Sequence, residues 1–313
     1  MSNAEIDEYT SKIKMPELPE VTTTVNGLNN VLKGLSIKDV WSDYFVNTSN
    51  KRTDNIKNKK YFEKFKSEIV GEKFKNAERR GKNILIHFTN NKTVLIHMKM
   101  TGHLLYGKYE WNGKKWKSDV PLLSDSFNQF IHLIFTLSNG KYLAFSDMRK
   151  FAKVIMFETD KKHEHVDLVG LGPEPLDGLS KDTLKAQVLK KPNWDIKTVL
   201  MDQSIVAGIG NIYSDEILWT AGVHPERKPT SLTNNEISDM WKATTEILER
   251  SIKMGGDSMS DYRNIYGEKG NFQNAHMVYR RTKQKCLKKG CKGIIERKII
   301  GGRSAHFCNT HQK

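Results

Sequence analysis

The stretch Gly170-Leu-Gly-Pro-Glu-Pro-Leu176 separates two parts of the chain whose apolar residues follow different patterns. Before it, short apolar runs alternate as in strands, and after it the apolar residues recur at helical spacing. Its glycines and prolines interrupt both patterns, which is typical of a connection between domains. The 313 residues suffice for two domains, each with its own core. The sequence therefore predicts a multi-domain α+β protein with a linker over residues 161–178.

One long helix is expected at the start of the first part. From Glu20 to Lys33 the apolar residues recur at helical spacing, and Pro19 and Gly34 suit the start and end of a helix. The residues expected on its buried face are Val21, Val25, Leu28 and Leu32.

Between residues 36 and 157 the apolar period changes to two, without intervening helices. The expected strands are Asn83–Phe88, Thr93–Met98, His132–Leu137 and Lys141–Phe145. Asn90-Asn91 separates the first two, and Ser138-Asn139-Gly140 separates the others. Asn-Gly is the strongest short turn signal, because both central residues of its turn need positive φ. Successive hairpins predict an antiparallel sandwich or barrel, and we expect a β-sandwich over residues 15–160.

Beyond the linker, residues 179–275 are expected to be helical. Thr233-Asn-Asn-Glu236 is a capping box, in which the threonine accepts from the Glu236 amide and the glutamate reaches back. A long helix therefore begins there, and Gly255-Gly256 ends it. The residues expected on its buried face are Ile237, Met240, Trp241, Thr244, Ile247, Leu248 and Ile252.

All three cysteines lie in the last expected domain, residues 276–313. Cys286, Cys291 and Cys308 are followed by His311 in the spacing C-x4-C-x16-C-x2-H. Two close pairs separated by a hairpin can place four ligands around one tetrahedral zinc. The alternative is three unrelated thiols and an incidental histidine, which this clustering disfavours. A site without an open ligand position is structural, so we expect one structural Zn2+.

The predicted zinc site is expected to have a structural role. Gly301-Gly302-Arg303 supplies the turn between two strand-like arms, and zinc would hold the Gly301–His306 turn rigid. His306 competes as a ligand, but it lies two residues before Cys308, so His311 is favoured.

The charge of the chain favours a polyanionic partner. It carries 51 Lys+Arg against 36 Asp+Glu, a net charge of +15. Each neutralised phosphate releases counterions, although lysine-rich surfaces also serve solubility alone. No apolar stretch approaches the length of a membrane span, so no membrane partner is expected. The polar residues 1–14 form neither a signal nor a transit peptide and are expected to be a disordered leader. An odd cysteine count fits a reduced cytoplasmic setting.

Six segments, in this order, resemble the formamidopyrimidine-DNA glycosylase and endonuclease VIII family. They are Met15-Pro-Glu-Leu-Pro-Glu-Val21, Arg79-Arg-Gly-Lys82, Asp147-Met-Arg-Lys-Phe151, Leu171-Gly-Pro-Glu-Pro-Leu176, Met201-Asp-Gln203 with Gly208-Ile-Gly-Asn-Ile-Tyr213, and the C-terminal finger. The resemblance covers essentially residues 15–313, and Leu18 is closer to the formamidopyrimidine branch. It implies a helix-two-turn-helix DNA-binding domain over residues 179–275 and a monomeric, nucleoid-associated bacterial repair enzyme.

The resemblance also implies the chemistry of a bifunctional DNA glycosylase and abasic-site lyase that removes oxidised purines. As an N-terminal residue, Pro16 would attack C1′ of the damaged nucleotide, expel the base and form an iminium. The iminium acidifies the C2′ proton, so β- and then δ-elimination follow. Glu17 matches the general acid/base at the sugar ring oxygen. Lys82 matches the catalytic lysine, and Arg303 matches the arginine that grips the phosphates and assists elimination.

Further residues match the parts of the family that hold double-stranded DNA carrying an oxidised base or an abasic site. Removing a base requires flipping it out of the duplex, and Met100, Arg149 and Phe151 match the wedge that fills the gap. Asn211 matches an asparagine that contacts phosphate near the lesion, and Lys197 matches a further basic contact. Glu20 either lines the lesion pocket or stabilises the first turn of its helix.

Each residue has an ordinary structural alternative. Met100 and Phe151 are types that more often form the core of a sheet. Asn211 can cap a helix, and we expect it both to turn the chain and to bind phosphate. Lys82 alone would be a solvated lysine at least as often as a functional one, and Pro16 alone a turn proline. The joint order of the matches favours the functional reading.

The sequence departs from the family pattern in four places. Pro16 follows Met15, so its nitrogen is nucleophilic only if Met15 is the true start and is removed. The finger has C-x4-C where the family has C-x2-C, and His311 replaces a fourth cysteine. Phe130 and Asn193 stand where basic or histidine contacts are expected, which puts those contacts in doubt.

Two other functions remain open. One is an endonuclease VIII-like glycosylase with a preference for oxidised pyrimidines. The other is a non-catalytic zinc-finger protein that binds damaged DNA and retains the leader. Lesion preference depends on a loop around Asp257–Phe272, which is rich in Gly, Asp and Asn.

Overall fold

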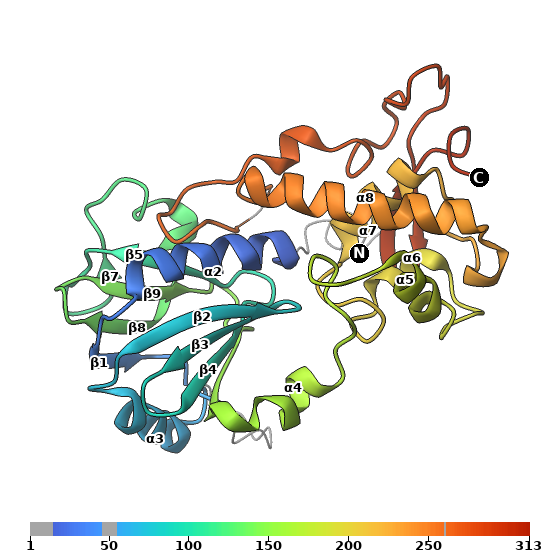
Figure 1. The fold of residues 1–313 in the computed structure, drawn as a ribbon. Coiled ribbons are helices and arrows are strands. Elements are labelled where there is room, and N and C mark those ends of the chain that lie inside the picture. The colour runs from blue at the N-terminus through green and yellow to red at the C-terminus, as the bar shows by residue number, and fades with distance from the viewer. Residues whose placement is uncertain (1–14, 46–54, 260) are drawn as a thin grey trace. The chain divides into compact units, whose positions relative to one another are not determined.

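The computed structural model describes residues 15–45, 55–259 and 261–313, so the leader expected over residues 1–14 lies outside the described residues. The chain forms two compact units (Figure 1). Among the described residues, the first unit consists of residues 15–16, Glu20–His165 and Gly255–Gly270. The second contains Glu17–Pro19, Val166–Met254 and Asn271–Lys313. Each unit thus includes a short segment from elsewhere in the sequence. The domains expected from the sequence were continuous ranges and did not include such segments.

The first unit is built on two four-stranded antiparallel sheets, with the strand orders β1-β8-β9-β5 and β10-β4-β3-β2 (Figure 1). The strands are β1 (Ile37–Ser42), β2 (Phe74–Arg80), β3 (Asn83–Phe88), β4 (Lys92–His97), β5 (His103–Gly107), β8 (Ile131–Leu137), β9 (Tyr142–Ser146) and β10 (Lys153–Glu158). The four expected strands are β3, β4, β8 and β9, each within one residue at either end. The predicted β-sandwich is confirmed.

The two expected turns differ in their backbone conformation. Asn91, between β3 and β4, has a φ of 61°. Between β8 and β9 only Gly140 has a positive φ, of 76°. The Leu137 N–H donates to the carbonyl oxygen of Lys141, 2.9 Å away, so this loop is longer than a two-residue hairpin. The expectation of positive φ at both central residues is therefore wrong for this turn.

Helix α2 (Leu18–Leu32) contributes its apolar face to the core of the first unit. The four residues expected to be buried are at most 6% exposed. Gly34 follows the helix with a φ of 78°, a conformation that glycine adopts without strain. Helix α3 (Lys59–Ile69) adds Phe62, Phe65 and Ile69 to the same core, which both sheets share.

The second unit is built on four helices, α5 (Lys181–Val188), α6 (Ile196–Met201), α7 (Asn211–Ala221) and α8 (Asn234–Lys253). The capping box of Thr233 and Glu236 is present at the start of α8, as predicted. Five of the seven residues expected on its buried face are buried, while Trp241 and Ile252 are partly buried against the same core. Gly255 and Gly256 follow with positive φ.

A two-stranded hairpin of β11 (Glu296–Ile300) and β12 (Arg303–Phe307) completes the second unit. Gly301 and Gly302 form its turn with φ of 57° and 74°. Positive φ at both central positions defines the turn that best matches the twist of a hairpin. A Cβ on Gly301 would lie 2.3 Å from the Thr198 hydroxyl, so this turn has room only for glycine there.

The remaining elements are short. They are β6 (Glu110–Trp111), β7 (Trp116–Lys117), α4 (Val166–Val169), and the 3-10 helices η1 (Ser126–Asn128), η2 (Thr159–Glu164), η3 (Pro229–Ser231) and η4 (Phe272–Ala275). Within the part of the chain that the structure describes, no helix has the length and apolar character needed to cross a membrane.

His103 makes the stability of the first unit depend on pH. It is completely buried in β5, with its ring nitrogens 2.8 Å from Asn128 Oδ1 and 3.1 Å from the Thr101 carbonyl oxygen. Burial lowers the pKa of His103 to about 4, against its ordinary value of 6.5. Between these values the unfolded chain takes up a proton that the folded chain does not. Stability is therefore lost as the pH falls.

We predict that the free energy of unfolding decreases from pH 7 towards pH 4.5 with a contribution from His103 of up to about 1.4 kcal/mol per pH unit. His103→Gln should remove this contribution, and His163→Gln, at an exposed position, should not. Urea unfolding at several pH values measures it. An unchanged pH dependence in His103→Gln would contradict the prediction.

Candidate functional site

Glu17 is held at the start of a buried helix. Its carboxylate is 4% exposed, and Oε1 accepts a hydrogen bond from the backbone N–H of Ile212, 3.1 Å away in the first turn of α7. Free N–H groups and the helix dipole favour a negative charge there. The neighbouring residue Pro16 is buried, and its nitrogen is bonded to Met15 in this chain. The general acid/base expected at Glu17 thus has a fixed position in the second unit.

Lys82 lies in the two-residue turn between β2 and β3. Arg80 pairs with Asn83 across this turn, and Gly81 has a φ of 57°. The Lys82 side chain is only 7% exposed, although lysines and hairpin turns are usually at the surface. Lys82 is therefore largely buried rather than solvated, and its matched catalytic role stays a prediction.

Met100, Arg149 and Phe151 lie together in the first unit. The Arg149 guanidinium lies 4.6 Å from the centre of the Phe151 ring, and its Nη1 lies 3.6 Å from Met100 Sδ. Phe151 is 49% exposed, so it is not a core residue. Stacking on the ring orients the guanidinium plane while leaving its edge able to donate hydrogen bonds. We call these three residues the wedge cluster.

A buried carboxylate shapes the two turns that carry the wedge cluster. Asp147 is 0% exposed and accepts hydrogen bonds from the hydroxyls of Tyr44 and Thr101 and from the Ala152 N–H. Thr101 Oγ1 also accepts from the Arg149 N–H at 3.2 Å. Burial raises the pKa of Tyr44, as does the charge of Asp147, so its hydroxyl keeps the proton that it donates. Asp147 thus ties the two turns to each other.

Glu20 contacts the loop that was expected to set lesion preference. Its carboxylate is 2% exposed and accepts from the Asp257 N–H at 2.7 Å. The Tyr262 hydroxyl donates to the Glu20 carbonyl oxygen at 2.9 Å. A Cβ on Gly256 would lie 2.9 Å from Glu20 Oε1, and this glycine has a φ of 83°. Glu20 therefore does more than stabilise its own helix, because it fixes the start of this loop.

Asn211 and Lys197 occupy different surroundings at the start of α7. Gly210 is the N-cap, so Asn211 begins the helix rather than capping it. Lys197 is 0% exposed, and its ammonium lies 2.5 Å from Asp215 Oδ1 and 3.2 Å from Ser214 Oγ. The expected phosphate contact of Lys197 needs a solvent-facing ammonium, which this structure does not provide. The structure corrects that assignment to a buried counterion of Asp215.

Asp215 also holds the hairpin that carries Arg303. Its Oδ2 accepts from the His306 N–H at 2.9 Å and lies 2.9 Å from His306 Nδ1. His306 is on β12, three residues after the exposed Arg303. His306 is not among the residues whose ligand atoms converge with the cysteines, so the structure does not favour it as a competing metal ligand. The network of Lys197, Asp215 and His306 joins α6, α7 and β12.

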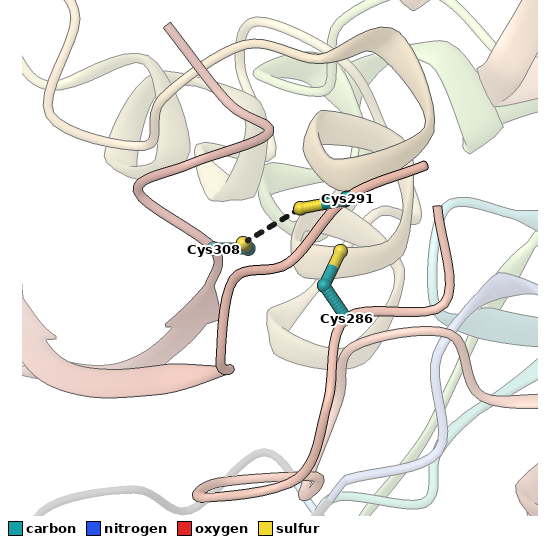
Figure 2. A group of neighbouring side chains, drawn as sticks. All are labelled: Cys286, Cys291 and Cys308. Atoms are coloured by element: carbon teal, nitrogen blue, oxygen red, sulfur yellow. Dashed lines mark hydrogen bonds between the residues drawn. The ribbon is translucent and has the colours of Figure 1, made fainter. Parts of the chain in front are cut away.

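The three cysteines converge, and Figure 2 shows their sulfur atoms turned toward one another. The ligand atoms of Cys286, Cys291 and Cys308 all lie within 4.8 Å of one another. Cys291 Sγ and Cys308 Sγ are 3.8 Å apart, far longer than a disulfide bond. A tetrahedron with Zn–S bonds of about 2.3 Å has edges of about 3.8 Å. The Gly293 N–H donates to Cys291 Sγ at 3.3 Å. The thiols therefore fit a zinc ion.

The structure does not bring His311 into this cysteine group. Its Nε2 lies 2.7 Å from the Trp219 carbonyl oxygen, to which it donates. This hydrogen bond leaves Nδ1 unprotonated, and zinc-bound histidines characteristically use their second nitrogen in this way. The tautomer of His311 therefore suits a zinc ligand, but its side chain does not lie within the cysteine group. Its role as the fourth ligand stays a prediction.

The matched residues are divided between the units. The first contains Pro16, Glu20, Lys82 and the wedge cluster, and the second contains Glu17, Lys197, Asn211, Arg303 and the cysteines. Three carboxylates with positioning roles were missed: Asp147, Asp215, and Glu216, which accepts hydrogen bonds from the backbone N–H groups of residues 277–279. Their signal was present in the sequence, because each acidic residue lies within or beside an apolar segment where a charge needs partners.

A β-sandwich unit and a helical unit with a cysteine hairpin define the class of protein. Residues 15–154 match the formamidopyrimidine-DNA glycosylase N-terminal domain, and residues 171–263 match the formamidopyrimidine-DNA glycosylase H2TH domain. The chain belongs to the formamidopyrimidine-DNA glycosylase family.

Relatives and solved structures agree with this assignment. The formamidopyrimidine-DNA glycosylase of Desulforamulus reducens is 37% identical over 96% of this chain and 99% of the relative. That of Bacillus cereus is 35% identical over 94% and 98%. The Lactococcus lactis Fpg in complex with DNA containing an abasic site has a TM-score of 0.79, at 28% identity over 95% of this chain and 99% of that one. A mutant of the same Fpg has been solved with Fapy-dG-containing DNA, with the same TM-score.

The zinc fit leads to a prediction. The purified chain should contain one zinc ion, and His311→Gln should weaken zinc retention against a chelator by at least about tenfold if His311 completes the site. His224→Gln is the matched control, because His224 packs on Phe307 outside the cysteine group. Metal analysis during chelator titration measures both. Equal zinc retention in the two variants would show that His311 is not a ligand.

The contacts of Asp147 with the wedge cluster lead to a second prediction. Asp147→Asn should destabilise the first unit by about 1.5–3 kcal/mol, because an amide cannot accept from all three donors. It should also reduce lesion-induced unstacking of the opposite base, followed by 2-aminopurine fluorescence. Asp39→Asn, at an exposed ion pair with Lys66, is the control. An Asp147→Asn protein with unchanged stability and fluorescence would refute this role.

Proposed function

We propose that this protein is a base-excision repair glycosylase and abasic-site lyase that removes oxidised purines such as 8-oxoguanine and formamidopyrimidines from double-stranded DNA. The observation that carries the proposal is the Pro16-Glu17 pair, in which a potential amine nucleophile adjoins a carboxylate fixed at the start of α7. Membership of the family and a net charge of +15 support it. The solved complexes of the Lactococcus lactis Fpg contain DNA with an abasic site or with Fapy-dG.

The reaction starts from Pro16 as the N-terminal residue, after removal of Met15. Its secondary amine forms a bond to C1′ while the bond from C1′ to the damaged base breaks, and the proton released by the amine leaves with the base. Ring opening breaks the bond between C1′ and O4′ and gives the iminium. Loss of the C2′ proton then expels the 3′ phosphate, and a second elimination expels the 5′ phosphate. An amide nitrogen lacks the free lone pair for the first step.

The other matched residues have defined tasks. Glu17 donates a proton to O4′ as the ring opens, since its carboxyl group neighbours the nucleophile in sequence. Lys82 and Arg303 stabilise the developing negative charge of the sugar and phosphates. The buried environment of Lys82 strengthens such an interaction, because little water screens it.

The wedge cluster supports a flipped-base mechanism. The exposed Phe151 and the partly buried Met100 can occupy the space that an extruded base leaves. The oriented guanidinium of Arg149 can donate to the orphaned partner base. Asn211 donates through its side-chain amide to a phosphate near the lesion. Glu20 and the loop beginning at Asp257 would contact the damaged base.

Zinc would be held by the three cysteines, with His311 as the proposed fourth ligand. Bound there, it supplies no chemistry to the reaction and acts as a crosslink. The residues of the chain position Arg303 through the Gly301-Gly302 turn and the contact of His306 with Asp215.

The proposal predicts a covalent adduct. Protein that begins at Pro16 should be trapped by borohydride on duplexes with 8-oxoguanine or an abasic site, with the adduct on Pro16 by peptide mapping. Protein with residues 1–313 intact should not be trapped. Glu17→Gln should slow base release by about 10²–10⁴-fold while leaving duplex binding close to normal.

The outcomes separate the remaining functions. Faster release of thymine glycol than of 8-oxoguanine would replace the substrate class with oxidised pyrimidines. Lesion-dependent binding without an adduct in either protein would identify a non-catalytic damage-binding protein. Intact mass of the cellular protein decides whether Pro16 is the N-terminus.

A further inference from the structure

The first unit contains a small cavity that has no part in the proposed repair reaction. It lies beside the hairpin of β6 and β7 and has a volume of about 190 Å³. Its apolar walls are Tyr109, Trp116, Leu123 and Ile131, and Lys115 and Lys117 also line it. Sites for drug-sized ligands measure about 300–1,000 Å³. A cavity of this size is therefore suited to a single planar ring system.

Two buried donors in the cavity wall lack acceptors. The Tyr109 hydroxyl and the Trp116 Nε1 are closed to solvent and have no hydrogen-bond partner among the described residues. Tyr109 is 4% exposed. Buried polar groups are nearly always paired, so an unpaired one requires an explanation. A ligand acceptor that reached either donor would gain a hydrogen bond without displacing one to water or protein.

The surroundings of the cavity combine aromatic rings with lysines. The Trp116 ring centre lies 5.4 Å from that of Tyr142, 5.7 Å from that of Trp111 and 6.0 Å from that of Trp41. The segment from Lys108 to Lys117 carries four lysines in ten residues. Aromatic surfaces stack nucleobases of any sequence, and neighbouring cations hold their phosphates.

We propose that this cavity is an accessory binding site for one unpaired nucleotide unit. The base occupies the cavity, where its carbonyl oxygens accept from Tyr109 and Trp116. The phosphate lies at Lys115 and Lys117. An apolar ligand would leave both donors unpaired, whereas a base brings both a flat ring and carbonyl acceptors. The ligand is a free mononucleotide or one residue of a single strand, since both present the same base and phosphate.

The site can be tested without lesion DNA, so its failure would leave the borohydride result untouched. Thymidine 5′-monophosphate should quench tryptophan fluorescence saturably, while thymidine and deoxyribose 5-phosphate should each bind at least about fivefold more weakly. Tyr109→Phe should weaken binding of the monophosphate by about 3- to 10-fold. It should not lower the Tm, because the hydroxyl makes no hydrogen bond in the free protein.

Matched variants isolate the contributions. Lys115→Ala should weaken binding of the monophosphate but not of thymidine, and the exposed Lys114→Ala should change neither. Tyr106→Phe controls for loss of a tyrosine hydroxyl, because that group accepts from Asn139. A short oligothymidylate that binds more tightly than the monophosphate, and is weakened by Tyr109→Phe, identifies a single strand as the source. The reverse order identifies a free nucleotide. Absence of saturable binding by either probe, or equal affinity in Tyr109→Phe, would overturn the proposal.

Discussion

The second unit is organised by the need to partner charges on a buried helix. Eight of the eleven residues of α7 are buried, and two of them are the adjacent carboxylates Asp215 and Glu216. Burying an unpaired charge is so costly that surrounding segments must supply donors. Asp215 receives Lys197 and His306, while Glu216 accepts from the N–H groups of residues 277–279 at 2.8–3.1 Å. Burial raises the pKa of Glu216 despite these bonds. These contacts hold α6, the finger hairpin and the segment leading to it against one helix.

Buried carboxylates also position surface groups in the first unit. An apolar core joins the two sheets and α2, but such packing tolerates small shifts of a surface turn. The hydrogen bonds of Asp147 have stricter directional requirements, so they place the turns of Met100 and Arg149 relative to each other. Glu20 performs a similar task for the loop that begins at Asp257. In both units, buried carboxylates position exposed groups.

The finger combines two kinds of constraint. Gly293 allows the close approach of Cys308, since a Cβ there would lie 2.5 Å from its Sγ. The cysteine spacing and the 3.8 Å separation of two sulfurs suit a metal crosslink, whereas the Asp215 contact attaches the hairpin to α7 without one. His311 is oriented by the Trp219 carbonyl oxygen and packs against its ring. Arg303 thus lies on a hairpin that Asp215 holds through His306 and that the cysteine group flanks.

The sequence alone determined the elements whose signals are local. Helix α8 followed from the Thr233 capping box and its apolar stripe, and β3, β4, β8 and β9 from alternation. The cysteine group followed from spacing, because ligands close in sequence need few long-range contacts to meet. Tertiary structure decided the rest. Lys197 matched a further basic contact of the family, whereas the structure pairs its ammonium with Asp215, eighteen residues later. No periodicity reports such a pairing, since it depends on how α6 and α7 pack. The role of Asp147 likewise needed donors from Tyr44 and Thr101, which only the folded sheets bring to one carboxylate.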